Sequence, residues 1–232
     1  ALWGVLCLNV SAGIGVLSMA SPLIQEMFGG TLIGVPATLA QLTTGQKAEV
    51  ASIAAGFTGL LSLANIIGRL GWASLSDHIG RKRTYMIFFA LGAIMYALVP
   101  TAGRMGLLPA FVGIFVVILT MYGGGFATIP AYLADIFGTQ FVGAIHGRLL
   151  TAWSVAGLFG PWLVNTIRQF QLDRGVAPAD AYNVTMYILA GLLAVGFICN
   201  LAVRPVEERY YLKDQVAGSG HANSGNPPRS EA

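Results

Sequence analysis

The sequence predicts an all-α integral membrane protein with six membrane-spanning helices, and three observations support this class. Only 10% of the 232 residues are charged, whereas soluble domains carry roughly 25% charged residues. Hydrophobic residues make up 55% of the chain, so most of its surface cannot face water. Six apolar runs are long enough to cross a bilayer, a distance that takes about 20 helical residues.

The six runs lie at about 2–25, 48–76, 84–103, 105–134, 140–167 and 181–203. Each is expected to be a helix, because a lone strand cannot satisfy its backbone polar groups in lipid. The third and fourth runs nearly merge, and we expect a turn where Pro100, Gly103, Arg104 and Gly106 cluster. The predicted bundle occupies residues 1–212.

The segment 213–232 is polar, contains glycine and proline, and is predicted to be a disordered tail in which His221 is solvated. The chain opens without methionine and is apolar at once, so we expect a fragment of a longer protein. Cys7 and Cys199 lie in apolar runs, without the spacing of a metal site or a disulfide framework, and are expected to be buried.

The distribution of basic residues predicts the orientation of the chain. Six spans place both termini on the same side of the membrane. The short loop 77–83 carries Arg81, Lys82 and Arg83, and short loops rich in lysine and arginine stay in the cytoplasm. The termini are therefore expected to be cytoplasmic, and the net charge of +3 reflects orientation rather than binding to nucleic acid.

The second span carries a polar stripe at steps of three and four residues, formed by Ser62, Asn65, Arg69, Trp72 and Ser76. An arginine left in hydrocarbon costs about 2.5 kcal/mol or more, so this face should turn toward protein or water. Two interpretations stay open: Arg69 binds an anion through its planar fork of N–H donors, or it merely reaches the membrane surface. Asn65 can donate a hydrogen bond but cannot carry a proton.

The segment ASLSDHIGRKR, residues 73–83, resembles the signature loop of the major facilitator superfamily. Matching positions are Leu75, Asp77, Gly80, Arg81 and Lys82, and the departures are Ala73 and His78. The resemblance implies a gating latch in which Asp77 pairs with an arginine and Gly80 allows a tight turn. Such transporters carry this loop in each six-helix half. The opening without methionine and the polar tail favour the C-terminal half, with an N-terminal half missing.

The chain is most similar to the oxalate/formate antiporter group of small-carboxylate transporters. The similarity rests on LNVSAGIGVLSMASPLIQEMF (8–28), NIIGR (65–69), MYGGGFATIPAYLADIFG (121–138) and AIHGRLLTAWSVAGLFGP (144–161). In that group an arginine at the position of Arg69 binds substrate carboxylate. The oxalate carrier also uses a lysine where Trp153 stands here, so lactate, pyruvate or formate become as plausible as oxalate. Related proton-coupled carriers have an aspartate in place of Asn65, and their proton relay is not carried over.

Further candidates lie in the fourth and fifth spans. Tyr122 is expected to point a hydroxyl into the substrate cavity. The glycines beside it and Pro130 predict either a deformable helix or close packing. His146 and Arg148 are expected near Asp135, as a structural ion-pair cluster or as gating residues. His146 is also the first suspect for any proton coupling, because the ordinary pKa of histidine lies near neutrality.

These features favour a secondary transporter that works by alternating access, in a bacterial inner membrane, with the bilayer and a small organic anion as partners and no cofactor. The sequence has no Walker loop, so ATP-driven transport is not expected. It has no HExxH, GxSxG or paired intramembrane aspartates, so an enzyme is not expected. The alternatives are a transporter of drugs or sugars, and a non-transporting membrane subunit in which the Arg69 stripe packs dry.

Overall fold

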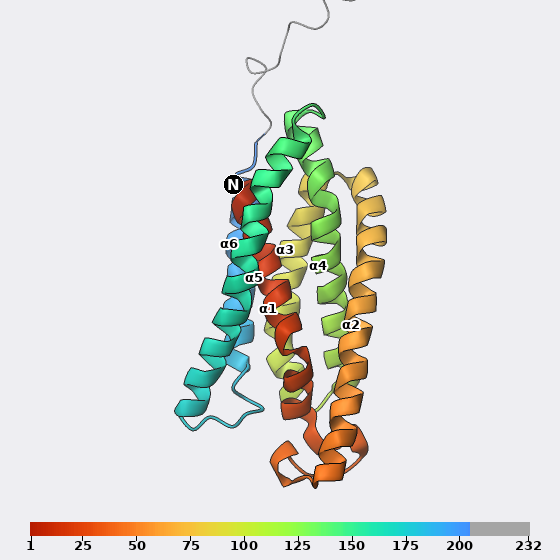
Figure 1. The fold of residues 1–232 in the computed structure, drawn as a ribbon, viewed down its shortest axis with the longest axis vertical. Helices are drawn as coiled ribbons and strands as arrows, with labels where there is room; N and C mark the ends of the chain where they lie inside the picture. The colour runs from red at the N-terminus through yellow and green to blue at the C-terminus, as the bar shows by residue number, and fades with distance from the viewer. Residues whose placement is uncertain (205–232) are drawn as a thin grey trace, which may run out of the picture.

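The computed structural model describes residues 1–204, and this part of the chain contains six long helices and no strand (Figure 1). Their bounds are α1 Leu2–Phe28, α2 Thr44–Ile79, α3 Arg81–Arg104, α4 Leu108–Phe137, α5 Val142–Asp173 and α6 Asn183–Leu201. The connection between α1 and α2 contains two short 3₁₀ helices, η1 Gly29–Ile33 and η2 Leu39–Gln41. The predicted tail 213–232 lies outside the described residues.

Every predicted apolar run corresponds to one of these helices, and the differences concern their ends. The helices α2 and α5 are 36 and 32 residues long, so both extend beyond their predicted runs. The turn between the third and fourth runs falls at 105–107, where Gly106 has a φ of 63°. Pro100 was expected in this turn but lies inside α3, because the helix continues to Arg104.

Within residues 1–204, five of the six helices are long and apolar enough to cross a membrane. The exception is α5, whose apolar sequence is interrupted by polar residues such as Ser154, Asn165 and Arg168. The all-helical architecture predicted from the sequence is confirmed.

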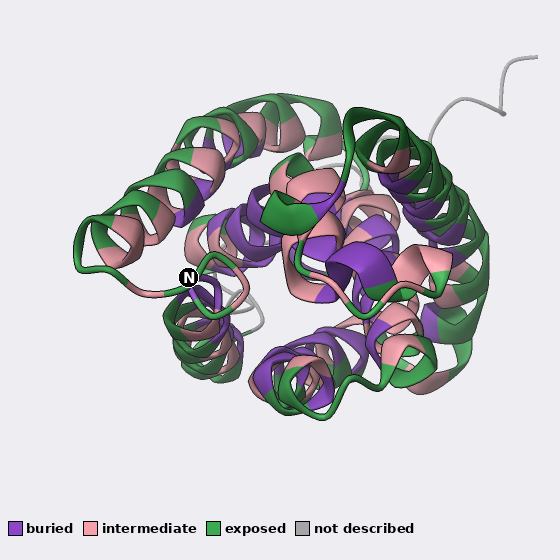
Figure 2. Ribbon diagram, turned by 90° about the horizontal axis from the view of Figure 1, so that it is seen from below, coloured by how far each residue is buried: buried purple, intermediate pink, exposed green. Residues whose placement is uncertain are grey.

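The helices run alternately up and down the bundle, and α2 packs most extensively on α4, α1 on α5, and α3 on α6. In Figure 1, α1 lies between α5 and α2, with α3 behind it and α6 behind α5. The alternation brings the start of α1, the α2–α3 turn, the α4–α5 loop and the end of α6 to one end, here called the basic end. Seen from the opposite end, the buried residues concentrate on the faces where helices meet (Figure 2).

Glycines bring α2 and α4 into near-backbone contact, and we call this contact the glycine seam. A Cβ on Gly68 would lie 2.1 Å from the carbonyl oxygen of Thr120, and one on Gly123 would lie 2.1 Å from that of Asn65. A Cβ on Gly124 would lie 2.5 Å from the Cβ of Trp72. Small residues permit such an approach between membrane helices. Of the two roles predicted for these glycines, the structure shows close packing.

Candidate functional site

Arg69 lies on the exposed surface of the bundle, and its side chain points away from the basic end. Its Nε donates a hydrogen bond to Oδ1 of Asn65 at 3.2 Å. Asn65 stands one turn earlier in α2, in the direction of the helix N-terminus in which helical side chains lean. The Cα of Arg69 lies ten residues, or about 15 Å, before the end of α2 at Ile79. The guanidinium is therefore held inside the span instead of reaching for the nearer surface.

No carboxylate neutralises Arg69 in the described part of the chain. The ion pairs among residues 1–204 join Arg81 to Asp77 and Asp135, and Arg168 to Glu26. The Cζ of Arg69 instead lies 5.3 Å from the centroid of the Phe126 ring, a cation–π contact that leaves the guanidinium donors largely available. An arginine in this state can bind an anion through two parallel N–H bonds.

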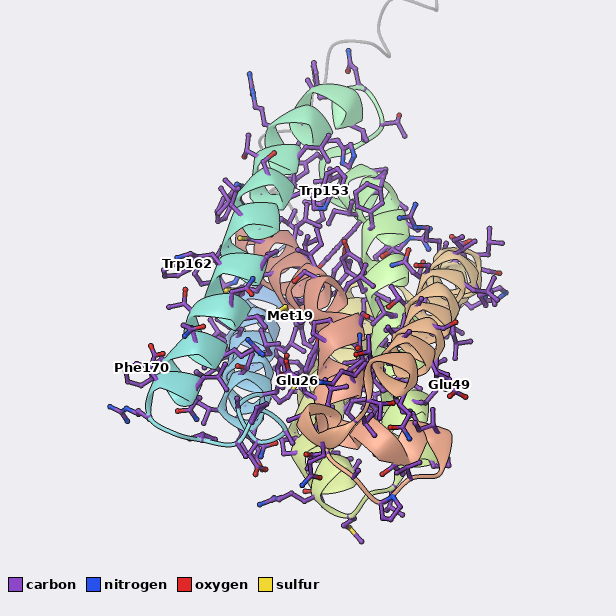
Figure 3. All side chains as sticks on the ribbon, turned by 60° about the horizontal axis from the view of Figure 1, so that its bottom comes forward. Met19, Glu26, Glu49, Trp153, Trp162 and Phe170 are labelled. Carbon is purple, nitrogen blue, oxygen red and sulfur yellow. The ribbon has the colours of Figure 1, made fainter. Side chains whose placement is uncertain are left out.

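Aromatic residues from α4 and α5 form a wall beside this arginine. The rings of Phe126 and Trp153 lie 5.3 Å apart, and Trp153 is 40% exposed. Figure 3 shows Trp153 between α5 and α4, whereas Trp162 projects outward from α5. Tyr122 lies near both Trp153 and Arg69, and its ring covers Gly13 of α1, where a Cβ would lie 2.3 Å from the ring.

The structure thus gathers the four residues proposed from sequence for the substrate site: Asn65, Arg69, Tyr122 and Trp153. They come from α2, α4 and α5. Phe126 was missed, although it stands one helical turn after Tyr122 and so shares its face. Its ring links the arginine to the indole.

A buried amide lies behind Tyr122. Asn9 of α1 is 6% exposed, and its Nδ2 has no hydrogen-bond partner among the described residues. Asn9 and Tyr122 both line a small cavity of about 10 Å³, with Tyr96 and Met121 on its other sides. This volume is close to the minimum for one water molecule. A bound water or substrate group at this position would satisfy the amide.

The signature loop forms an ionic junction between three helices at the basic end. Arg81 pairs with Asp77 of α2, donates to Ser76 Oγ at 2.5 Å, and lies 3.8 Å from Asp135 of α4. Gly80 links α2 to α3 with a φ of 88°, in the left-handed region that favours glycine. Asp77 thus pairs with an arginine, while its role as a gating latch stays a prediction.

Lys82 makes a separate contact with the end of α6. Its Nζ donates to the carbonyl oxygens of Leu201 at 3.2 Å and Val203 at 2.7 Å. In return, Asn200 Nδ2 donates to the Lys82 carbonyl at 3.0 Å, and Tyr132 of α4 donates to Asn200 Oδ1 at 3.1 Å. A cation at a helix C-terminus satisfies terminal carbonyls and the helix dipole. Lys82 therefore fixes α3 to α6.

The ion-pair cluster expected between Asp135, His146 and Arg148 does not form within residues 1–204, so this prediction was wrong. Asp135 lies on the face of α4 that meets the start of α3, and its partner is Arg81. Arg148 is exposed, and Nδ1 of His146 is buried without a hydrogen-bond partner in the described part of the chain.

At the opposite end, Arg168 of α5 binds Glu26 of α1. Nε donates to Oε2 at 3.3 Å and NH2 donates to Oε1 at 2.5 Å. The two side chains are only 22% and 14% exposed, and the Arg168 Cζ lies 5.5 Å from the Tyr182 ring. Figure 3 shows Glu26 near the end of α1. Nothing in the spacing of Glu26 and Arg168 along the sequence indicates that α1 and α5 would be joined by this pair.

The family model of the Major Facilitator Superfamily matches residues 2–224. The chain belongs to the major facilitator superfamily. It is therefore an integral membrane protein of a family of transporters, in agreement with the helical bundle and its apolar helices.

Two curated proteins are similar to parts of this chain. The chain is 31% identical over 133 residues to an oxalate:formate antiporter of Oxalobacter formigenes, covering 57% of this chain and 31% of that protein. It is 25% identical over 151 residues to apicoplast pyruvate carrier 1 of Toxoplasma gondii, covering 64% of this chain and 26% of that protein. The matched parts thus span about a third or less of each relative.

Proposed function

We propose that this chain is the C-terminal half of a secondary transporter for small organic anions such as formate, lactate, pyruvate or oxalate. The observation that carries the proposal is Arg69, an intramembrane arginine that no carboxylate in residues 1–204 neutralises. Ionisable residues kept within a span commonly mark substrate pathways. Both curated relatives carry small carboxylates by name.

Alternating access provides the mechanism. A substrate carboxylate binds the Arg69 fork, Asn65 holds that fork in position, and Tyr122 offers a hydroxyl. The second half of the transporter supplies the opposite wall, and the two halves rock around the bound anion. The junction of Asp77, Arg81 and Asp135 is suited to a gate at the basic end, because each partner lies on a different helix. The termini are proposed to face the cytoplasm of a bacterial inner membrane.

The wall beside Arg69 favours a monocarboxylate. One guanidinium neutralises one carboxylate, and Trp153 with Phe126 presents apolar rings where a second charge of a dicarboxylate would need a partner. The substrate site does not include His146, Arg148, Gly80 or Lys82. His146 and Arg148 remain candidates for gating, whereas Gly80 and Lys82 hold the signature loop.

Uptake of labelled formate, lactate, pyruvate and oxalate by the full-length protein in proteoliposomes tests this proposal. Arg69→Gln should reduce uptake of every transported anion by roughly 30-fold or more, because the charge pair with the substrate carboxylate is lost. Arg69→Lys should retain part of the activity, since it keeps the charge but not the fork. Arg104→Gln, at the opposite end of the bundle, is the matched control and should transport normally.

Three outcomes would decide against the carboxylate assignment. Normal anion uptake by Arg69→Gln would remove the role of Arg69. Transport of neutral sugars or drugs that is unaffected by this substitution would favour another substrate class, and absence of any transport would favour a non-transporting subunit. Trp153→Lys adds a cation to the wall and should shift preference toward oxalate, so an unchanged profile contradicts our assignment of that position.

A further inference from the structure

A pocket of about 410 Å³ opens at the basic end, and none of its lining residues belongs to the candidate substrate site. Its basic lining comes from two separate elements. The residues that line it are Ile79, Gly80, Arg81, Lys82, Arg83, Tyr132, Asp135, Ile136, Val203 and Arg204. Four cationic side chains thus share this space with a single carboxylate.

The existing contacts distinguish two kinds of cation in this pocket. Arg81 is committed to Asp77, Ser76 and Asp135, and Lys82 is committed to the carbonyls that end α6. These bonds occupy donor groups of two of the four cations. Arg83 and Arg204 are exposed, and neither forms an ion pair with another residue in the range 1–204. Among the described residues, two guanidinium groups from different elements thus line one pocket without an ion-pair partner.

The backbone adds to the positive potential. The helix α3 starts at Arg81, and no side chain caps its N-terminus. Its first-turn N–H groups lie at the positive end of the helix dipole, which favours an anion. The apolar side of the same pocket is formed by Ile79, Ile136 and Val203. A ligand that has an anionic head next to a hydrocarbon portion matches this combination of basic and apolar lining.

We propose that this pocket binds a phosphate group, supplied by the head of an anionic phospholipid. The two arginine forks of Arg83 and Arg204 bind the phosphate oxygens, as guanidinium groups bind phosphate elsewhere. The pocket is lined by residues of the α2–α3 junction, of α4 and of the segment after α6. The α2–α3 junction lies at the basic end of the bundle (Figure 1). The ends of membrane-spanning helices lie at the level of the lipid headgroups. Basic pockets between membrane helices bind such headgroups. The site does not depend on the identity of the transported anion.

Native mass spectrometry of the full-length protein, titrated with phosphatidylglycerol, phosphatidylcholine or inorganic phosphate, tests the site. Wild-type protein should bind phosphatidylglycerol more tightly than phosphatidylcholine. The double variant R83Q/R204Q should weaken phosphatidylglycerol binding by roughly 30-fold, as expected for two basic residues near a membrane surface. R104Q/R174Q removes the same charge from exposed arginines at the opposite end and should bind as wild type does.

The remaining outcomes separate the possibilities. R83K/R204K keeps the charge and should retain most binding, which guards against a variant that fails to fold. In another outcome, inorganic phosphate binds the wild type but not R83Q/R204Q, while neither lipid binds. That result would support the phosphate site but show that its ligand is a soluble phosphate and not a lipid. Equal binding of both lipids, or an equal loss in R104Q/R174Q, would overturn the proposal.

Discussion

Gly123 of α4 lies directly against the backbone of Asn65 in α2, so that a Cβ at Gly123 would stand 2.1 Å from the Asn65 carbonyl oxygen. Asn65 in turn accepts the hydrogen bond that orients Arg69. The position of the arginine fork thus depends on the glycine seam between these two helices.

Gly123→Ala should separate α2 from α4 and destabilise the protein by about 1–3 kcal/mol, the usual range for overpacking. Gly113→Ala on the same helix is the matched control, because a Cβ at Gly113 would have nothing within 4 Å of it. That control should be neutral or stabilise by about 0.5–1 kcal/mol. Thermal melting of the purified full-length protein measures both. Equal melting temperatures for the two variants would contradict the close packing.

Asn65→Asp should impair transport more than Asn65→Ala does. The new carboxylate would stand one helical turn from Arg69, pair with its guanidinium and compete with the substrate for the same N–H donors. Asn65→Ala removes only one hydrogen bond, which contributes about 1 kcal/mol. Initial uptake rates over a range of anion concentrations check this. A faster rate for the aspartate variant than for the alanine variant would be inconsistent with a free Arg69 fork.

Phe126→Leu should raise the KM for the transported anion by roughly two- to fivefold, because it removes a cation–π contact of about 0.5–1 kcal/mol while keeping an apolar side chain. Phe126→Trp should keep KM close to the wild-type value. Concentration-dependent uptake in proteoliposomes provides the measurement. If leucine and tryptophan give the same KM, the ring does not position Arg69.

Lys82→Met keeps an apolar stem but removes the ammonium that caps α6. The free energy of unfolding should fall by about 1 kcal/mol or more, since two charged hydrogen bonds to carbonyls are lost. Lys47→Met is the control, because Lys47 is exposed and forms no ion pair with any residue in the described range. Thermal melting of both variants and the wild type measures the effect. If Lys82→Met melts like Lys47→Met, the contact of Lys82 with the end of α6 does not stabilise the protein.

Glu26 and Arg168 should show energetic coupling of about 1 kcal/mol or more in a double-mutant cycle. Each single variant, Glu26→Gln or Arg168→Gln, leaves a largely buried charge without its partner, which costs more than removing both. The double variant should therefore melt closer to the wild type than the sum of the two single effects predicts. Strictly additive effects would show that the pair contributes nothing to holding α1 against α5.

The sequence by itself determined the membrane class, the order of the six helices and the choice of Asn65, Arg69 and Tyr122. The superfamily and Trp153 came from motifs that resemble a known family. The length of an apolar run indicates a helix directly, because in lipid the backbone N–H and C=O groups of a segment must hydrogen-bond to one another. Period-3.6 spacing then reports which polar residues share a face. Both signals are local, so the sequence carries them without knowledge of the fold.

Tertiary structure alone decided the partners across helices. Asp135 binds Arg81 and not His146 or Arg148, Glu26 binds Arg168, and Lys82 caps α6. Phe126 contacts Arg69 because the glycine seam sets α4 against α2, and it contacts Trp153 because α5 packs on α4. Such pairings depend on how helices rotate and approach one another. In lipid, helix rotation and approach depend on how the side chains of separate segments fit together. No local pattern within one segment encodes this fit.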